Sequence, residues 1–149
     1  MNILRHDEIR DENENHQLLR GTNILIAEDD EHIREFLTFY LESCGATVSS
    51  AENGLESFLK ALDGKFNVIL MDLNLPVMNG VSSIKKMRAA GYVGPVIAMS
   101  ANDEKSKSLE CLQGGFDDFV SKPFDLDLVV KKLVYWKNNL LKSELRVLH

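Results

Sequence analysis

The chain has 149 residues, of which 44% are hydrophobic and 27% are charged, a composition typical of soluble globular domains. Its formal net charge of -6 argues against a broad basic surface, so direct binding of nucleic acid is not expected. No apolar run is long enough to span a membrane, and residues 1–20 are too polar for a secretory signal, which predicts a cytoplasmic protein without membrane insertion.

Residues 1–20 form a polar opening segment, rich in acidic side chains and poor in apolar surface. We interpret this segment as a leader or linker. Residues 21–141 are predicted to form one domain, and residues 142–149 a C-terminal tail.

From Asn23 onward, short apolar runs alternate with longer amphipathic stretches, which predicts parallel strands joined by helices. The expected strands are Ile24–Ala27, Thr47–Ser50, Phe66–Met71, Val96–Ser100 and Phe119–Ser121. The expected helices are Glu31–Cys44, Leu55–Leu62, Val81–Ala90, Asp103–Gln113 and Leu126–Leu141. The pattern therefore indicates an α/β fold with a buried parallel sheet, and it leaves the order of the strands open.

The first expected helix has a clear apolar face, and Gly45 follows it as a stop signal. Asp30 and Asp103 are interpreted as caps at the N-termini of two of the helices. The residues expected on the apolar face are Ile33, Phe36, Leu37, Tyr40 and Leu41.

Polar groups stand at the ends of four expected strands, which in a parallel sheet share one edge. They are Glu28 and Asp29 after the first strand, Asp72 after the third, Ser100 at the end of the fourth, and Lys122 after the fifth. Three carboxylates at one edge repel one another unless a cation neutralises them. A few hard oxygen ligands suit Mg²⁺, whose coordination is completed by water and phosphate oxygens.

The same residues predict a site that accepts a phosphoryl group. The carboxylate of Asp72 is the candidate nucleophile, because a carboxylate can form an aspartyl phosphate. Lys122 would counter the charge of the phosphoryl group, and Ser100 would donate a hydrogen bond to it.

Several segments make the chain resemble the receiver domain of two-component response regulators, from Asn23 to about Lys137. The segments are Ile24–Asp30, Asn53–Gly54, Met71–Gly80, Met99–Ala101 and Ser121–Phe124. The resemblance implies a flavodoxin-like, doubly wound, five-stranded parallel sheet with strand order 2-1-3-4-5. It also implies that the peptide bond between Lys122 and Pro123 is cis.

The resemblance further implies a role for each residue of the site. Asp72 would be phosphorylated, and Ser100 would be the switch hydroxyl. The implied Mg²⁺ ligands are Glu28, Asp29, Asp72 and the backbone carbonyl of Asn74, with Asp29 binding directly and Glu28 through water. Phe119 takes the position of the family's aromatic switch residue, although a core phenylalanine would explain it equally well.

The implied function is that of a signalling switch rather than an enzyme with a separate substrate. A histidine kinase or a histidine phosphotransfer protein would supply the phosphoryl group. Phosphorylation would then shift a face formed by residues 106–113, Phe119 and residues 126–136, and this face would control a downstream protein partner. Both a stand-alone regulator and a receiver from a larger chain, such as a hybrid histidine kinase, stay open.

Two other classes of protein are alternatives. A flavin-binding module of similar fold would need a glycine- or hydroxyl-rich first loop to hold phosphate, whereas Glu28, Asp29 and Asp30 would repel it. A phosphatase with an aspartate nucleophile would be expected to carry that nucleophile after the first strand, whereas Asp72 follows the third.

Overall fold

The computed structural model describes residues 17–101, 110, 112 and 114–138. The strands are β1 (Asn23–Ala27), β2 (Thr47–Ala51), β3 (Val68–Asp72), β4 (Val96–Ser100) and β5 (Asp118–Ser121). The helices among the described residues are α2 (Glu31–Ser43), α3 (Gly54–Asp63), α4 (Gly80–Ala89) and α6 (Leu126–Lys137). Residues 1–16 of the leader, the cap Asp103, most of the expected helix Asp103–Gln113 and the end of the last expected helix lie outside the described residues. The end of the expected leader is described, and Leu19 is fully buried in the core.

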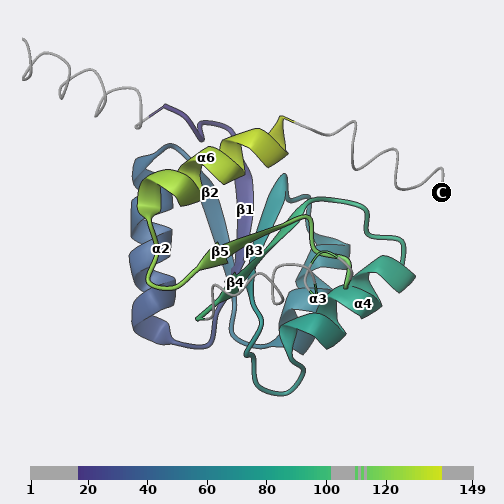
Figure 1. Cartoon of the computed structure of the whole chain (residues 1–149). Helices are drawn as coiled ribbons and strands as arrows, with labels where there is room; N and C mark the ends of the chain where they lie inside the picture. The colour runs from purple at the N-terminus through teal and green to yellow at the C-terminus, as the bar shows by residue number, and fades with distance from the viewer. Residues whose placement is uncertain (1–16, 102–109, 111, 113, 139–149) are drawn as a thin grey trace, which may run out of the picture.

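The five strands form one parallel sheet in the order β2-β1-β3-β4-β5, which confirms the predicted fold class and strand order (Figure 1). Helices α2 and α6 cover one face of the sheet, and α3 and α4 cover the other (Figure 1). Because all five strands run in the same direction, their carboxyl ends lie along one edge.

The core consists of two apolar layers, one on each face of the sheet. Successive strand residues point to opposite faces, so Ile24 and Ile26 pack toward α2 and α6, whereas Leu25 and Ala27 pack toward α3 and α4. The central strands β3 and β4 are buried along their whole length. This double burial explains why their sequences are continuously apolar up to their last residues.

Two features of the predicted elements are corrected by the structure. Strand β3 runs from Val68 to Asp72 rather than from Phe66 to Met71, because Asp72 is still paired with Met99 of β4. Phe36 is 53% exposed, although it was expected on the buried face of the first helix. That face is centred on Leu37 and Leu41, and neighbouring helix residues are turned about 100° from one another.

Helix α3 begins in close contact with the loop between β3 and α4. A Cβ atom at Gly54 would overlap the carbonyl oxygen of Met78, so only glycine fits there without a shift of the backbone. The Ser83 hydroxyl of α4 donates a hydrogen bond of 2.7 Å to the carbonyl of Gly54. These two contacts fix the loop that follows Asp72.

We expect Gly54→Ala to destabilise the protein by about 1–3 kcal/mol, because the added methyl group overpacks a backbone contact. Urea denaturation followed by circular dichroism measures the change. Leu55→Ala is the control, since it places the same residue at the next position of α3, where the side chain is 41% exposed. Equal stability of Gly54→Ala and the wild type would contradict the close contact.

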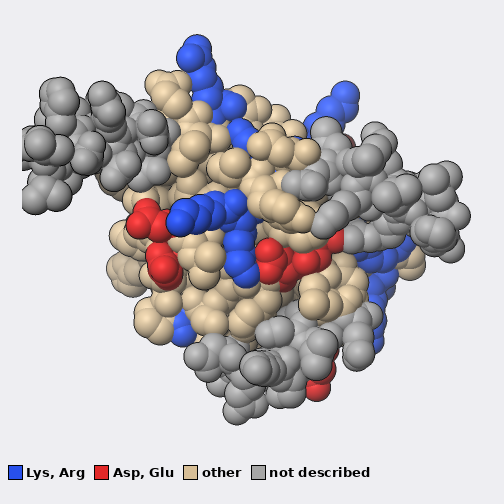
Figure 2. All heavy atoms as spheres, turned by 45° about the horizontal axis from the view of Figure 1, so that its top comes forward, with Lys and Arg blue, Asp and Glu red and all other residues tan. Residues whose placement is uncertain are grey.

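Charged side chains of both signs lie together on the face of the molecule shown in Figure 2, where Lys and Arg are interspersed with Asp and Glu. The absence of direct nucleic-acid binding stays a prediction, which the net charge of -6 favours. Within the described part of the chain, no helix has both the length and the apolar character needed to cross a bilayer.

Candidate functional site

The site residues come together because neighbouring strands end at the same level. Ala27 of β1 pairs with Met71 of β3, which brings Glu28 beside Asp72. On the other side of Asp72, Ser100 of β4 pairs with Ser121 of β5, and the amide of Lys122 donates a 2.7 Å hydrogen bond to the Ser100 carbonyl. The register of the sheet therefore gathers residues that are far apart in the sequence.

Three carboxylates form the acidic part of the site. Glu28, Asp29 and Asp72 can each offer one oxygen atom such that these atoms all lie within 4.8 Å of one another. Glu28 and Asp72 are buried, whereas Asp29 is exposed, so the group is open to solvent on one side. Such a set of hard oxygen donors fits a divalent cation that keeps part of its water shell, as Mg²⁺ does.

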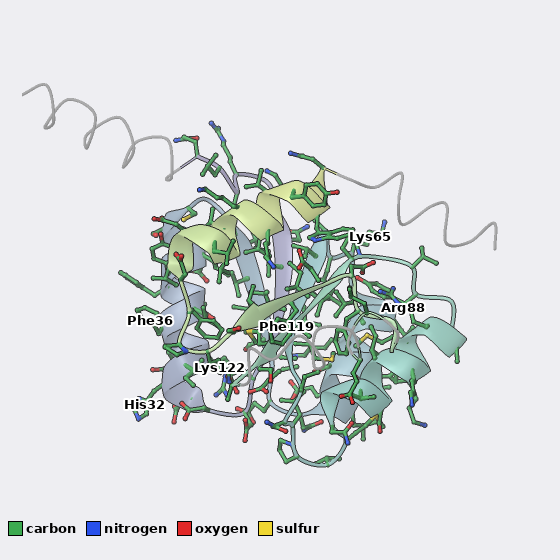
Figure 3. All side chains as sticks on the ribbon, viewed as in Figure 1. His32, Phe36, Lys65, Arg88, Phe119 and Lys122 are labelled. Atoms are coloured by element: carbon green, nitrogen blue, oxygen red, sulfur yellow. The ribbon has the colours of Figure 1, made fainter. Side chains whose placement is uncertain are left out.

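Lys122 lies between two of these carboxylates. Its Nζ atom is 2.6 Å from Oε1 of Glu28 and 2.7 Å from Oδ2 of Asp72. Figure 3 shows Lys122 at the edge of the sheet where the strands end, below the end of β5. The Lys122-Pro123 peptide bond is cis, as the resemblance implied. The ammonium group thus provides positive charge next to the oxygen atoms of Asp72.

The pKa values of Glu28 and Lys122 express the balance of burial and charge at the site. Burial raises the pKa of Glu28 to about 7, against the lowering effect of the Lys122 hydrogen bond and with a further raising contribution from Asp72. Burial by itself would lower the pKa of Lys122, but hydrogen bonds to Asp72 and Glu28 raise it above its ordinary value. The site holds three carboxylates and the ammonium group of Lys122, so a bound cation would favour the ionised form of Glu28.

The two oxygen atoms of Asp72 have different neighbours. Oδ2 faces Lys122, whereas Oδ1 accepts a 2.9 Å hydrogen bond from the backbone amide of Asn74. That amide contact was not anticipated from the sequence, which pointed instead to the carbonyl of Asn74. Coordination of a metal by this carbonyl stays a prediction.

The two predicted switch residues lie on β4 and β5. Ser100 is 4% exposed, at the end of β4, next to Asp72 in the sheet edge. Phe119 is half-buried and packs against the core layer on the side of α3 and α4. Its backbone carbonyl accepts a hydrogen bond of 2.6 Å from Lys132 of α6. The structure thus connects the backbone at Phe119 to α6.

Asp30 caps α2, as the sequence predicted, by accepting a 3.0 Å hydrogen bond from the amide of Ile33.

Arg34 follows Ile33 near the start of α2, and the sequence patterns assigned it no role. Its guanidinium group donates hydrogen bonds to the carbonyl oxygens of Glu28 and Asp29. A signal for it existed in the sequence, because a basic residue so near a helix N-terminus is electrostatically unfavourable and so calls for a separate explanation.

Comparison with known proteins identifies the family. Residues 24–134 match the family model of the response regulator receiver domain, so the chain belongs to that family. Receiver domains are the regulatory switch modules of two-component systems. Over 105 residues the chain is 41% identical to the KDP operon transcriptional regulatory protein KdpE of Escherichia coli, with 70% of this chain covered. The chain spans 46% of the length of that relative.

Solved structures of similar fold are also receiver domains. The receiver domain of sensor histidine kinase PA1611 from Pseudomonas aeruginosa, solved with magnesium in its active-site cleft, is 30% identical with a TM-score of 0.74, over 80% of this chain and 99% of the other. The receiver domain of Ssk1 from Saccharomyces cerevisiae, solved with the histidine phosphotransfer protein Ypd1, is 25% identical with a TM-score of 0.76, over 80% and 90% of the two chains.

Proposed function

We propose that this receiver domain accepts a phosphoryl group on Asp72. The observation that carries the proposal is the position of the Asp72 carboxylate, which is flanked by two further carboxylates and by the ammonium group of Lys122. An oxygen atom of Asp72 forms the new P–O bond, and the P–N bond to the histidine of the donor breaks. The electron pair of that bond leaves with the donor imidazole, which takes up a proton.

Glu28, Asp29 and Asp72 would hold Mg²⁺, which supplies positive charge to the phosphoryl oxygens. Asp29, the exposed member of the group, would bind the cation directly, and Glu28 would act through a water molecule. The carbonyl of Asn74 would complete the set of protein ligands. Support for this assignment comes from the excess of carboxylates over the single Lys122 ammonium group.

Ser100 and Lys122 would bind the transferred phosphoryl group. Lys122 provides charge from the end of β5, and the Ser100 hydroxyl provides a hydrogen bond from β4. Both strands would then move relative to β3, and Phe119 would change its position. This change stabilises an active conformation that already exists in minor amounts.

The phosphoryl donor would be a histidine kinase or a histidine phosphotransfer protein in the cytoplasm, and the output would be contact with a downstream protein. The complex of Ypd1 with the Ssk1 receiver domain supports the second kind of donor. Residues 21–141 would form the receiver unit, with residues 1–20 and 142–149 as its flanking segments. The domain would promote only its own phosphorylation and dephosphorylation.

Incubation with acetyl phosphate and Mg²⁺, followed by intact-mass spectrometry, tests the proposal. We expect the mass of one added phosphoryl group, and we expect a chelator of divalent cations to prevent it. A panel of histidine kinases and phosphotransfer proteins serves as a second source of donors. No added phosphoryl group from any of these donors would overturn the proposal, whereas release of phosphate from an added phosphomonoester would favour a phosphatase.

We expect Asp29→Ala to weaken Mg²⁺ binding more strongly than Glu28→Ala, because Asp29 is the proposed direct ligand. Amide chemical shifts in a Mg²⁺ titration of the three proteins measure the dissociation constants. Asp30→Ala is the matched control, since this neighbouring carboxylate caps α2 and is expected to affect mainly the stability of that helix. Equal affinity of the wild type and Asp29→Ala would contradict the ligand assignment.

A further inference from the structure

Arg34 of α2 contacts the backbone of the segment that carries two of the carboxylates. Its Nη1 atom donates hydrogen bonds of 2.9 Å to the carbonyl of Glu28 and 3.3 Å to the carbonyl of Asp29. Its Nη2 atom is 3.2 Å from Oε1 of Glu52, just after β2. The Arg34 side chain is 13% exposed, whereas that of Glu52 is 67% exposed. The Arg34 side chain is therefore largely shielded from solvent, whereas its partner Glu52 is exposed.

The backbone that Arg34 contacts, at Glu28 and Asp29, is the segment where the chain leaves the sheet after β1. The amide of Glu28 still donates to the carbonyl of Ala51, a bond of 3.0 Å that continues the pairing of β1 with β2. Beyond it the chain turns into α2, and it must direct the side chains of both Glu28 and Asp29 toward Asp72. The contacts of Arg34 fix the two peptide groups from which these side chains extend.

We propose that Arg34 is a positioning residue for the divalent-cation site, which it serves by holding the carbonyl groups of Glu28 and Asp29. This inference rests on the proposed function, because it requires that these carboxylates bind the cation. Arg34 donates to backbone carbonyls, so its own groups take no part in coordination. Its effect is to keep two carboxylates in a binding arrangement before the cation arrives.

Positioning and simple electrostatics predict opposite effects when the charge of Arg34 is removed. If Arg34 acted only as a nearby positive charge, its replacement by a neutral residue would strengthen the binding of a cation. If it positions the carboxylates, the same replacement weakens binding. The direction of the change in Mg²⁺ affinity therefore decides between the two roles.

We expect Arg34→Gln to weaken Mg²⁺ binding roughly 10- to 100-fold, the range for loss of groups that orient metal ligands. Mg²⁺ alone is the probe, and the dissociation constant comes from calorimetry or amide chemical shifts. Hydrogen exchange of the amides of Asp29 and Asp30 without Mg²⁺ gives a second measure, and we expect it to be faster in Arg34→Gln. Arg34→Lys keeps the charge but not the two-pronged donor group, so its affinity should be intermediate.

Two control variants separate the contacts of Arg34. Glu52→Gln removes only the negative charge of the exposed partner and should change the Mg²⁺ affinity less than Arg34→Gln does. Lys85→Gln removes one positive charge from the exposed surface of α4 and should leave the affinity unchanged. These comparisons distinguish the backbone contacts from the ion pair and from the net charge.

Several outcomes would overturn the positioning role. They are unchanged or tighter Mg²⁺ binding by Arg34→Gln, an equal loss of affinity in Lys85→Gln, and a lowered thermal stability of Arg34→Gln with no change in affinity. If Arg34→Gln does not fold, wild-type affinity in Arg34→Lys would also reject it. Failure of the wild type to bind Mg²⁺ would instead reject the proposed cation site itself, and the role of Arg34 with it.

Discussion

Asp72→Asn is expected to take up no phosphoryl group from acetyl phosphate or from a histidine-containing donor. The substitution replaces one carboxylate oxygen by an NH2 group, which is not a nucleophile, and the remaining carbonyl oxygen can still accept the hydrogen bond from the amide of Asn74. Lys122 loses its acceptor on Asp72 but keeps its ion pair with Glu28. The fold should therefore persist while the chemistry is lost. Intact-mass spectrometry of the treated protein measures the uptake, and circular dichroism checks the fold.

Asp63→Asn is the matched control for this experiment. It makes the same chemical change at an exposed carboxylate at the end of α3, away from the edge where the strands end. This variant should be phosphorylated like the wild type. A phosphoryl group retained by well-folded Asp72→Asn would show that another residue is the acceptor.

Lys122→Ala is expected to accept a phosphoryl group roughly 100-fold more slowly than the wild type, because a charge that stabilises the transition state is lost. It should also fail to transmit the phosphorylated state to the end of β5. The reason is that the Lys122 side chain, which lies 2.7 Å from Asp72, extends from the residue directly after β5. Amide hydrogen exchange over Asp118–Phe124, compared between the phosphorylated and the unphosphorylated protein, measures this transmission.

A comparison at equal occupancy separates the two effects of Lys122. Beryllofluoride, which stands in for the phosphoryl group, can be added until wild type and variant are equally occupied. Ser100→Ala should reduce the exchange response from the side of β4, and Lys131→Ala, an exposed lysine of α6, should leave it intact. A wild-type exchange response in Lys122→Ala would show that Lys122 does not transmit the signal.

The sheet and most of its helices could be predicted because their sequence patterns are produced by burial. Strands β3 and β4 are buried on both faces and therefore read as unbroken apolar runs. Gly45, with a φ of 98°, follows α2 as the expected stop signal. The strand order could not be predicted from burial, because it depends on pairing between distant segments. It came only from the family resemblance.

The residues at the strand ends could be predicted to meet, but their individual contacts could not. The common location of the carboxylates and Lys122 follows from the shared direction of the strands. The ion pairs of Lys122 with both Glu28 and Asp72 depend instead on side-chain rotamers. Arg34 was missed because its contacts with backbone carbonyls depend on the fold, and its only sequence signal was a basic residue near a helix N-terminus. The exposure of Phe36 was missed because it borders the apolar stripe rather than lying within it.

The junction between β5 and α6 gives the protein an intrinsic optical reporter. Trp136, the only tryptophan of the chain, donates a 2.8 Å hydrogen bond from its indole nitrogen to Asp118, and Lys132 binds the same carboxylate. Asp118 directly precedes Phe119 in β5. Indole emission depends on the polarity and hydrogen bonding around the ring. The fluorescence of the unlabelled protein should therefore respond to any movement of β5 that phosphorylation causes.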